Sequence, residues 1–211
     1  MVAVLCSKLP DRFTADEAVK DALSLFRAEA NRDYFETLKK NKNSDSIKES
    51  FFAINLLAEA IDMLPCRCDK DSLVLKKTDS GKPYFVCSDI RFSISHSKGR
   101  VAVAVSDSED IGIDIECAEI SSEKAKKLSK RFFSETEALA VDNNPEIFKQ
   151  LWCEKEAETK LLGGELSTYL KSLKDENNKD QIIFQRFFWN KDPVILCSKQ
   201  NFSTIVFKIH S

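Results

Sequence analysis

Histidine is scarce in this chain, and long apolar runs are missing. His96 and His210 are its two histidines, and none of its seven cysteines falls in a paired zinc-binding pattern, which disfavours a zinc site. An odd number of cysteines also favours a reducing compartment over a disulfide framework. No stretch approaches the roughly 20 apolar residues of a membrane span, and the run from Val2 to Cys6 is too short for a signal peptide. We therefore expect a cytoplasmic protein without a membrane partner.

The chain also lacks a surplus of basic charge. Its 32 lysines and arginines are offset by 34 aspartates and glutamates, for a formal net charge of -2. Because binding to a phosphate backbone depends on a basic surface, no nucleic-acid partner is expected. With 211 residues and 43% hydrophobic content, the chain is long and apolar enough for one large domain or two small ones.

The centre of the chain has two segments with β-strand periodicity. Residues 101–105 and 111–115 alternate β-branched side chains with small or acidic ones, which predicts two strands. In the second strand, Asp114 and Glu116 share the face opposite the isoleucines, roughly 7 Å apart. Two such acids repel each other unless a cation lies between them, and a hard divalent cation suits oxygen ligands. A half-exposed strand with solvated acids is the alternative interpretation.

A third acid is predicted on a helix near residue 156. In the stretch LWCEKEAETKLL, a spacing of four places Trp152, Glu156 and Lys160 on one helical face. An exposed helix with ordinary salt bridges explains the same pattern. Together with Asp114 and Glu116, however, Glu156 completes a set of three carboxylates suited to Mg²⁺, which keeps positions for water and substrate phosphates.

Two further segments complete this inventory of polar residues. Gly81-Lys82-Pro83 places a lysine on a turn, and Ser95-His96-Ser97 stands just before Gly99. A turn lysine is usually solvated and a lone histidine is usually structural. In combination with the acids and Lys160, they are the groups needed to hold a pyrophosphate around a metal ion.

The order strand, helices, strands occurs twice, with a join near residues 106–110. We expect an α+β fold of two similar α/β subdomains, residues 1–107 and 108–211, with a site in the cleft between them. Helix starts are predicted by capping boxes and by a proline in a first turn: Thr14 with Glu17, Ser46 with Glu49, Ser134 with Glu137, and Asn144-Pro145.

Four segments in order along the chain resemble one enzyme family: GKPY (81–84), FSISHS (92–97), IGIDIE (111–116) and LWCEKEAETK (151–160). KRFFSETE (130–137) lies between the last two, as it does in that family. The chain resembles the 4′-phosphopantetheinyl transferases, in particular the long type that acts in surfactin and other nonribosomal peptide pathways. The resemblance implies a pseudo-duplicated fold with the active site between the halves. It implies a monomer that uses coenzyme A as substrate and Mg²⁺ as cofactor, with Mn²⁺ as an alternative. The implied reaction moves the 4′-phosphopantetheine arm of coenzyme A to a serine hydroxyl of an apo acyl or peptidyl carrier protein and releases adenosine 3′,5′-bisphosphate.

The motif positions assign roles to individual residues by resemblance. The implied metal ligands are three acids: Asp114, Glu116 and Glu156. The residues implied to contact coenzyme A are Lys82, Pro83, Ser95, His96 and Lys160. The implied catalytic residues are Glu156, which accepts the serine proton directly or through a water, together with Lys160 and His96 at the phosphates.

Recognition of the 3′-phosphate is left open by the sequence. Many relatives have an arginine near the start of the second helix that helps hold this phosphate, whereas the stretch here reads IKESFF (47–52). The basic residues that remain candidates for this role are Lys48, Arg27, Arg32, Lys39, Lys40 and Lys42.

Two rival functions fit part of the pattern. A metal-dependent nuclease pairs acids with an E-x-K string, which Glu158 and Lys160 provide, but that string lies in a helical pattern here. A module that binds coenzyme A or a carrier protein without turnover is the other rival. The presence of all three acids and both lysines disfavours this second alternative.

Overall fold

The computed structural model describes residues 1–12, 14–40, 43–65, 68–142, 144–164, 166, 168–169 and 181–210. Helices and strands are mixed along the chain, which confirms the α+β class. The strands are β1 (Val2–Lys8), β2 (Val74–Lys77), β3 (Pro83–Val86), β4 (Arg91–Ser97), β5 (Arg100–Ser106), β6 (Ile111–Ile115), β7 (Ile183–Trp189), β8 (Asp192–Ser198) and β9 (Ile205–His210). The α-helices are α1 (Ala15–Leu25), α2 (Asn31–Lys39), α3 (Ser44–Asp62), α4 (Ser122–Phe132), α5 (Glu135–Val141) and α6 (Pro145–Leu162), and a 3₁₀ turn covers Lys70–Ser72.

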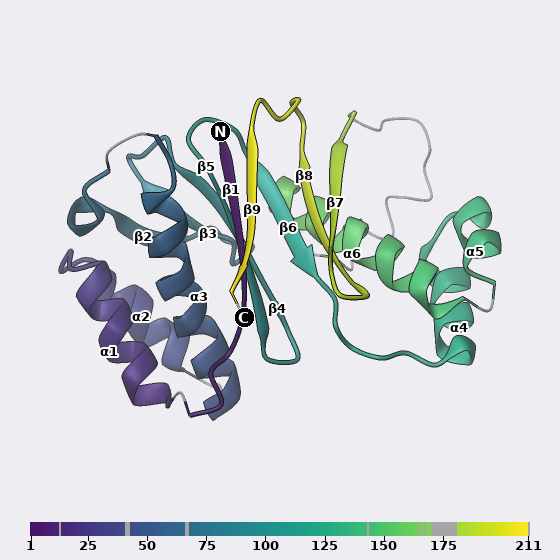
Figure 1. Cartoon of the computed structure of the whole chain (residues 1–211), viewed down its shortest axis with the longest axis horizontal. Helices are drawn as coiled ribbons and strands as arrows, with labels where there is room; N and C mark the ends of the chain where they lie inside the picture. The colour runs from purple at the N-terminus through teal and green to yellow at the C-terminus, as the bar shows by residue number, and fades with distance from the viewer. Residues whose placement is uncertain are drawn as a thin grey trace.

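Two sheets form the centre of the molecule. One has the strand order β4-β5-β1-β9 and the other has the order β6-β8-β7, while β2 and β3 form a separate hairpin. Helices α1, α2 and α3 lie on one side of this pair of sheets, and α4, α5 and α6 lie on the other (Figure 1). The chain therefore forms a layered structure in which the two sheets are enclosed by helices.

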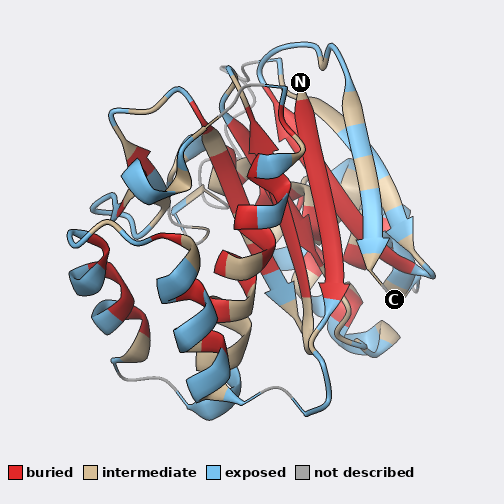
Figure 2. Ribbon diagram, turned by 60° about the vertical axis from the view of Figure 1, so that its left-hand side comes forward, coloured by how far each residue is buried: buried red, intermediate tan, exposed pale blue. Residues whose placement is uncertain are grey.

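Strand β1 shows why the two sheets pack together. Its alternate residues Ala3 and Leu5 belong to the core beneath α1–α3, whereas Val2, Val4 and Cys6 pack against the isoleucines of β6. A strand apolar on both faces must be covered on both faces. Figure 2 shows β1 buried along most of its length. The isoleucine face predicted for residues 111–115 is confirmed as part of this core.

The two halves of the chain have the same local strand order. In the first half, β1 pairs antiparallel with β5, whose other neighbour is β4; in the second, β6 pairs antiparallel with β8, whose other neighbour is β7. A duplication of one subdomain stays a prediction, as does the boundary between residues 107 and 108. Strand β9 crosses that boundary, because it pairs in parallel with β1.

Most predicted helix starts are confirmed, and one is wrong. Capping boxes are formed at Thr14 and Ser134, and Asn144 caps α6. The box predicted at Ser46 is not formed: the Asn43 side chain accepts from the Ser46 N–H, so α3 begins one residue after Asn43. A helix needs only one cap, and the earlier asparagine takes this role.

Helix α4 was not anticipated from the lysine-rich stretch after residue 116. Ser121 caps it, and Ala125, Leu128 and Phe132, at helical spacing, pack into one apolar cluster, so the period is present in the sequence but is surrounded by lysines. Within the described ranges, no helix is both long and apolar enough to cross a bilayer.

Candidate active site

A row of serine hydroxyls joins β4 to β6. Hydroxyl oxygens of Ser93, Ser95 and Ser97 accept hydrogen bonds from the N–H groups of residues 113, 115 and 117 at 3.0, 3.3 and 3.0 Å. These N–H groups point away from β8, because β6 pairs with β8 through its other edge. The serines therefore satisfy backbone groups that would otherwise be buried without partners, and they fix the position of β6 against β4.

Two of these serines also hold the predicted metal-ligating acids. Ser95 donates its hydroxyl hydrogen to Asp114 Oδ1 at 2.6 Å, and Ser97 donates to Glu116 Oε1 at 2.8 Å. The backbone N–H of Ala118 also donates to Glu116 Oε1, at 2.7 Å. Asp114 is only 3% exposed, so its carboxylate is not a solvated surface acid. The alternative of a half-exposed strand is wrong for this residue.

Helix α6 brings Lys160 and Glu156 to the same place. Lys160 Nζ donates to Asp114 Oδ1 at 2.7 Å. Burial, together with repulsion from Asp114 and Glu116, raises the pKa of Glu156 to about 7, against the opposing effects of Lys160 and a hydrogen bond from Trp152. The helical face predicted from the spacing of residues 152, 156 and 160 therefore faces the two acids of β6.

The close approach of α6 to β6 depends on a glycine. A Cβ atom at Gly112 would lie 2.0 Å from the backbone oxygen of Ala157 and 2.8 Å from the backbone nitrogen of Leu161. No side chain fits at this distance, so residue 112 must be glycine for the helix to lie this near the strand. The helix ends at Gly163, which has a left-handed φ of 70° that glycine adopts without strain.

The carboxylates near β6 suit a cation by their chemistry. Among the described residues, no three histidine, cysteine or acidic side chains stand close enough together to form a ready-made metal site. Burial, and after it the charge of Asp114, raises the pKa of Glu156, so a cation beside these carboxylates would favour their ionised form. Carboxylate oxygens are the ligands that hard divalent cations prefer, so Asp114, Glu116 and Glu156 fit such an ion.

Lys82 and Pro83 lie at the far end of α6. Lys82 Nζ donates to the Leu161 carbonyl at 3.2 Å, and burial lowers the pKa of Lys82 against the opposing effect of Asp110. Both residues line a groove of about 490 Å³ together with Tyr84. The structure thus places Lys82 at the C-terminal end of α6, against the residue that follows Lys160.

His96 is a predicted site residue that the structure places on the side of β4 opposite the acids. It lies between two serines whose hydroxyls reach β6, so strand alternation places it on the opposite face of β4. There its Nδ1 lies 3.0 Å from Glu49 Oε2 of α3.

The basic candidates for the 3′-phosphate are dispersed. Arg27 pairs with Asp71 at 3.8 Å, and Lys39 pairs with Glu36 at 2.7 Å. Arg32 and Lys40 are exposed, and Lys42 lies outside the described residues. Among these candidates, Lys48 borders a groove that is also bordered by Glu49, the residue that contacts His96.

Three contributors to the site were not assigned from the sequence. Ser93 and Ser97 complete the serine row, and the period of two in FSISHS is the signal that marks them. Cys153 is buried on α6, and the pKa of its thiol is raised by burial, by the charge of Asp114 and by a hydrogen bond to that carboxylate. Cys153 carries no signal in the sequence that distinguishes it from the other cysteines.

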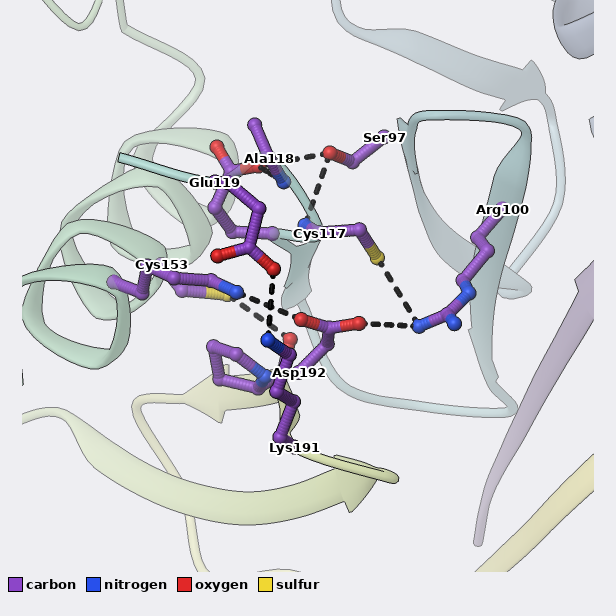
Figure 3. Close-up of polar contacts among 11 residues, drawn as sticks. Ser97, Arg100, Cys117, Ala118, Glu119, Cys153, Lys191 and Asp192 are labelled. Carbon is purple, nitrogen blue, oxygen red and sulfur yellow. Dashed lines mark hydrogen bonds and ion pairs between the residues drawn. The ribbon is translucent and has the colours of Figure 1, made fainter. Parts of the chain in front are cut away.

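A buried ion cluster fixes the chain just after Glu116. Asp192, at the start of β8, accepts from Lys149 Nζ at 2.7 Å and from the guanidinium of Arg100. The same guanidinium contacts Cys117 Sγ at 3.6 Å, and burial raises the pKa of this thiol to about 11. Figure 3 shows Asp192 between the Arg100 and α6 sides of this cluster. It ties β5, β8 and α6 together beside the acids.

The comparison with known families and proteins agrees with the motifs. Residues 110–207 match the model of the 4′-phosphopantetheinyl transferase superfamily. The chain is 31% identical over 137 residues to the 4′-phosphopantetheinyl transferase gsp of Aneurinibacillus migulanus, covering 63% of this chain and 55% of the relative. It is 35% identical over 132 residues to the 4′-phosphopantetheinyl transferase Sfp of Bacillus subtilis, covering 60% of this chain and 57% of the relative.

A further protein of Bacillus subtilis, named 4′-phosphopantetheinyl transferase, is 41% identical over 112 residues. The match covers 46% of each of the two chains. The chain therefore spans about half the length of the curated relatives it matches. The family resemblance indicated by the motifs is confirmed.

Proposed function

We propose that this protein transfers the 4′-phosphopantetheine arm of coenzyme A to a serine hydroxyl of an apo acyl or peptidyl carrier protein, in a reaction that depends on Mg²⁺. One observation carries the proposal: Asp114, Glu156 and Lys160, from two motifs far apart in the sequence, meet at one partly buried place. The similarity of the chain to proteins named 4′-phosphopantetheinyl transferase supports the reaction class.

The positive charge proposed for this site would bind the diphosphate of coenzyme A. A divalent cation bound by the three acids would supply positive charge to the diphosphate of coenzyme A. Lys160, which already donates to Asp114, would donate to a phosphate oxygen as charge develops on it. Lys82 and Pro83 would line the nucleotide side of the site, where their groove opens.

Ser95 and Glu156 have separate roles in the proposed reaction. Ser95 orients the Asp114 carboxylate through its 2.6 Å hydrogen bond, so the acid keeps one position. Glu156 is our candidate for the acceptor of the carrier-serine proton, directly or through a water. The phosphorus–oxygen bond to the bisphosphate breaks as the serine oxygen bonds to the pantetheine-side phosphorus, and adenosine 3′,5′-bisphosphate leaves.

The metal ion, the oligomeric state and the cellular compartment are part of the same proposal. Mg²⁺ is the proposed ion and Mn²⁺ the alternative, since both accept carboxylate oxygens. We propose a monomer in which the site lies between the two halves, working in the cytoplasm, where cysteines stay reduced.

The test is a transfer assay read by intact mass. The protein is incubated with coenzyme A, Mg²⁺ and a panel of apo carrier proteins, each paired with a variant whose acceptor serine is alanine. We expect a mass increase of one phosphopantetheine on at least one carrier and none on its alanine variant. Carriers that stay unmodified throughout, while the protein still binds coenzyme A in calorimetry, would support the inactive binding module instead.

The positions of Glu158 and Lys160 disfavour the nuclease alternative. Glu158 and Lys160 of its E-x-K string lie on α6. The carboxylate of Glu158 interacts with Tyr169, whose pKa is raised by burial and by the hydrogen bond and charge of Glu158. Glu158 therefore faces another side of the helix than Lys160. Degradation of plasmid DNA in the presence of Mg²⁺ would favour the nuclease.

A further inference from the structure

His96 faces Glu49 of α3, on the side of β4 opposite the acids. Its neighbours on the same face of β4, Phe92 and Ile94, pack into the core beneath α1–α3, whereas Ser95 and Ser97 point to β6. A ligand group that meets His96 is therefore separate from any group bound at the acids.

The Glu49 carboxylate fills the position next to His96. Its Oε2 lies 3.0 Å from His96 Nδ1, and its Oε1 accepts from the backbone N–H of Gly99 at 3.0 Å. A ring nitrogen and a backbone N–H that converge on one carboxylate form a small anion-binding arrangement. Here the anion is the protein's own side chain.

A groove of about 370 Å³ opens beside this arrangement and is bordered by Lys8 and Lys48. Both lysines have acidic partners, Asp11 at 3.4 Å and Asp45 at 3.6 Å. These aspartates are 87% and 88% exposed, so an incoming anion displaces them at little cost. Glu49 is different: its side chain is 17% exposed and both of its oxygens are engaged.

We propose that Glu49 determines substrate specificity by occupying the place that the ribose 3′-phosphate of coenzyme A would take beside His96. The inference rests on the proposed function, which makes coenzyme A the substrate. Coenzyme A has a diphosphate and a separate 3′-phosphate. Because His96 points away from the acids that would serve the diphosphate, the 3′-phosphate is the group it meets.

The consequence is a weak preference for the 3′-phosphate. A phosphate dianion that approaches His96 meets the negative charge of Glu49 at short range, and the two repel each other. The protein therefore uses coenzyme A and 3′-dephospho-coenzyme A with similar efficiency. Removing the charge of Glu49 should create the preference.

The experiment compares both nucleotides in two matched variants. Glu49→Gln keeps the size of the side chain and removes its charge. Glu59→Gln removes the same charge from the same helix, where Glu59 pairs with Lys208 at 3.4 Å and with His210 at 2.8 Å. We expect Glu49→Gln to raise kcat/KM for coenzyme A about tenfold and to leave that for 3′-dephospho-coenzyme A within about twofold, as the removal of one repulsive charge predicts. Glu59→Gln should change neither.

A binding measurement keeps the inference separate from catalysis. Calorimetry with adenosine 3′,5′-bisphosphate and with adenosine 5′-monophosphate needs no carrier protein and no turnover. Tighter binding of the bisphosphate alone in Glu49→Gln supports the inference even if the transfer assay fails, whereas that failure would contradict the proposed function. Equal gains for both nucleotides, weaker binding of the bisphosphate, or a wild-type preference for coenzyme A of about tenfold or more would overturn it.

Discussion

The Ser95 hydroxyl lies between a strand and a carboxylate: it accepts from the Ile115 N–H at 3.3 Å and donates to Asp114 Oδ1 at 2.6 Å. One side chain therefore joins β4 to β6 and orients the buried acid. The position of the acid and the packing of the two sheets are coupled, because both depend on the same hydroxyl group.

A comparison of Ser95→Ala with Ser93→Ala should separate the two roles of Ser95. Ser93→Ala and Ser95→Ala each leave one buried N–H of β6 without its acceptor, which costs about 1–3 kcal/mol of stability. Ser95→Ala alone also frees Asp114. We expect similar shifts in urea denaturation but a loss of transfer activity of about tenfold or more only in Ser95→Ala. Equal activities of the two variants would show that Ser95 does not orient the acid.

Asp114→Ala should damage activity and stability together. It removes one of the strong charges of the site, for which a loss of about 10²-fold in rate is expected. It also leaves Lys160 and Ser95 without their acceptor, so the melting temperature should fall. The measurement is activity against titrated Mg²⁺, with thermal melts on the same samples.

The matched control for Asp114 is Glu154→Gln. Glu154 accepts from Arg186 at 2.7 Å on another face of α6, so its loss should affect stability slightly and Mg²⁺-dependent activity little. A larger loss of activity in Glu154→Gln than in Asp114→Ala would contradict the assignment of the acids.

Gly112→Ala should disrupt the contact between β6 and α6. The added methyl group would lie 2.0 Å from the Ala157 carbonyl oxygen, and backbone cannot move aside as a flexible side chain does. We expect a loss of about 3 kcal/mol or more in the free energy of unfolding. Gly164→Ala is the control, since a Cβ there has no neighbour within 4 Å among the described residues. Two equally stable variants would show that the helix is free to shift.

Asp192→Asn should destabilise the fold through the ion cluster. The change leaves the ammonium of Lys149, which is 1% exposed, without its counter-charge, and breaking such a pair costs about 3–5 kcal/mol. The neighbouring pair of Lys191 and Glu119 is exposed, so Glu119→Gln should be almost neutral (Figure 3). Chemical denaturation of both variants provides the comparison.

The pair of Glu137 and Lys155 predicts a pH dependence of stability. Burial opposes ionisation of Glu137, but the hydrogen bond from Lys155 at 2.8 Å and those at Ser134 outweigh it, so the pKa of Glu137 is lowered. A carboxylate with a lowered pKa stabilises the fold above its unfolded pKa, and this stability is lost as the pH falls through the folded pKa. Glu137→Gln should therefore be less stable than wild type near pH 7, and the difference should shrink below about pH 4.

Urea denaturation at several pH values measures this difference. Glu135→Gln, in the exposed first turn of the same helix, is the control. A gap between Glu137→Gln and wild type that stays constant from neutral to acidic pH would contradict the role of the ionised pair.

The sequence by itself determined the local elements and the identity of the acids. Period-two alternation marked β5 and β6, and side-chain caps marked the starts of α1, α5 and α6, because strand alternation and capping are properties of neighbouring residues. The spacing of four in α6 placed Glu156 and Lys160 on one face. In contrast, α4 was missed although Ala125, Leu128 and Phe132 have helical spacing, because lysines dominate the stretch.

Tertiary structure alone decided which of these groups meet. Nothing local in FSISHS shows that its serines face β6 while His96 faces α3, since that depends on how two sheets pack. Glu49 was expected to complete a cap for α3, but Asn43 is the cap, and Glu49 instead contacts His96 and Gly99 about 50 residues later in the chain. The sequence also allows Asp114 to be a solvated acid on a half-exposed strand. In the structure it is buried and bonded to Ser95 and Lys160, because long-range packing sets the solvation of a carboxylate.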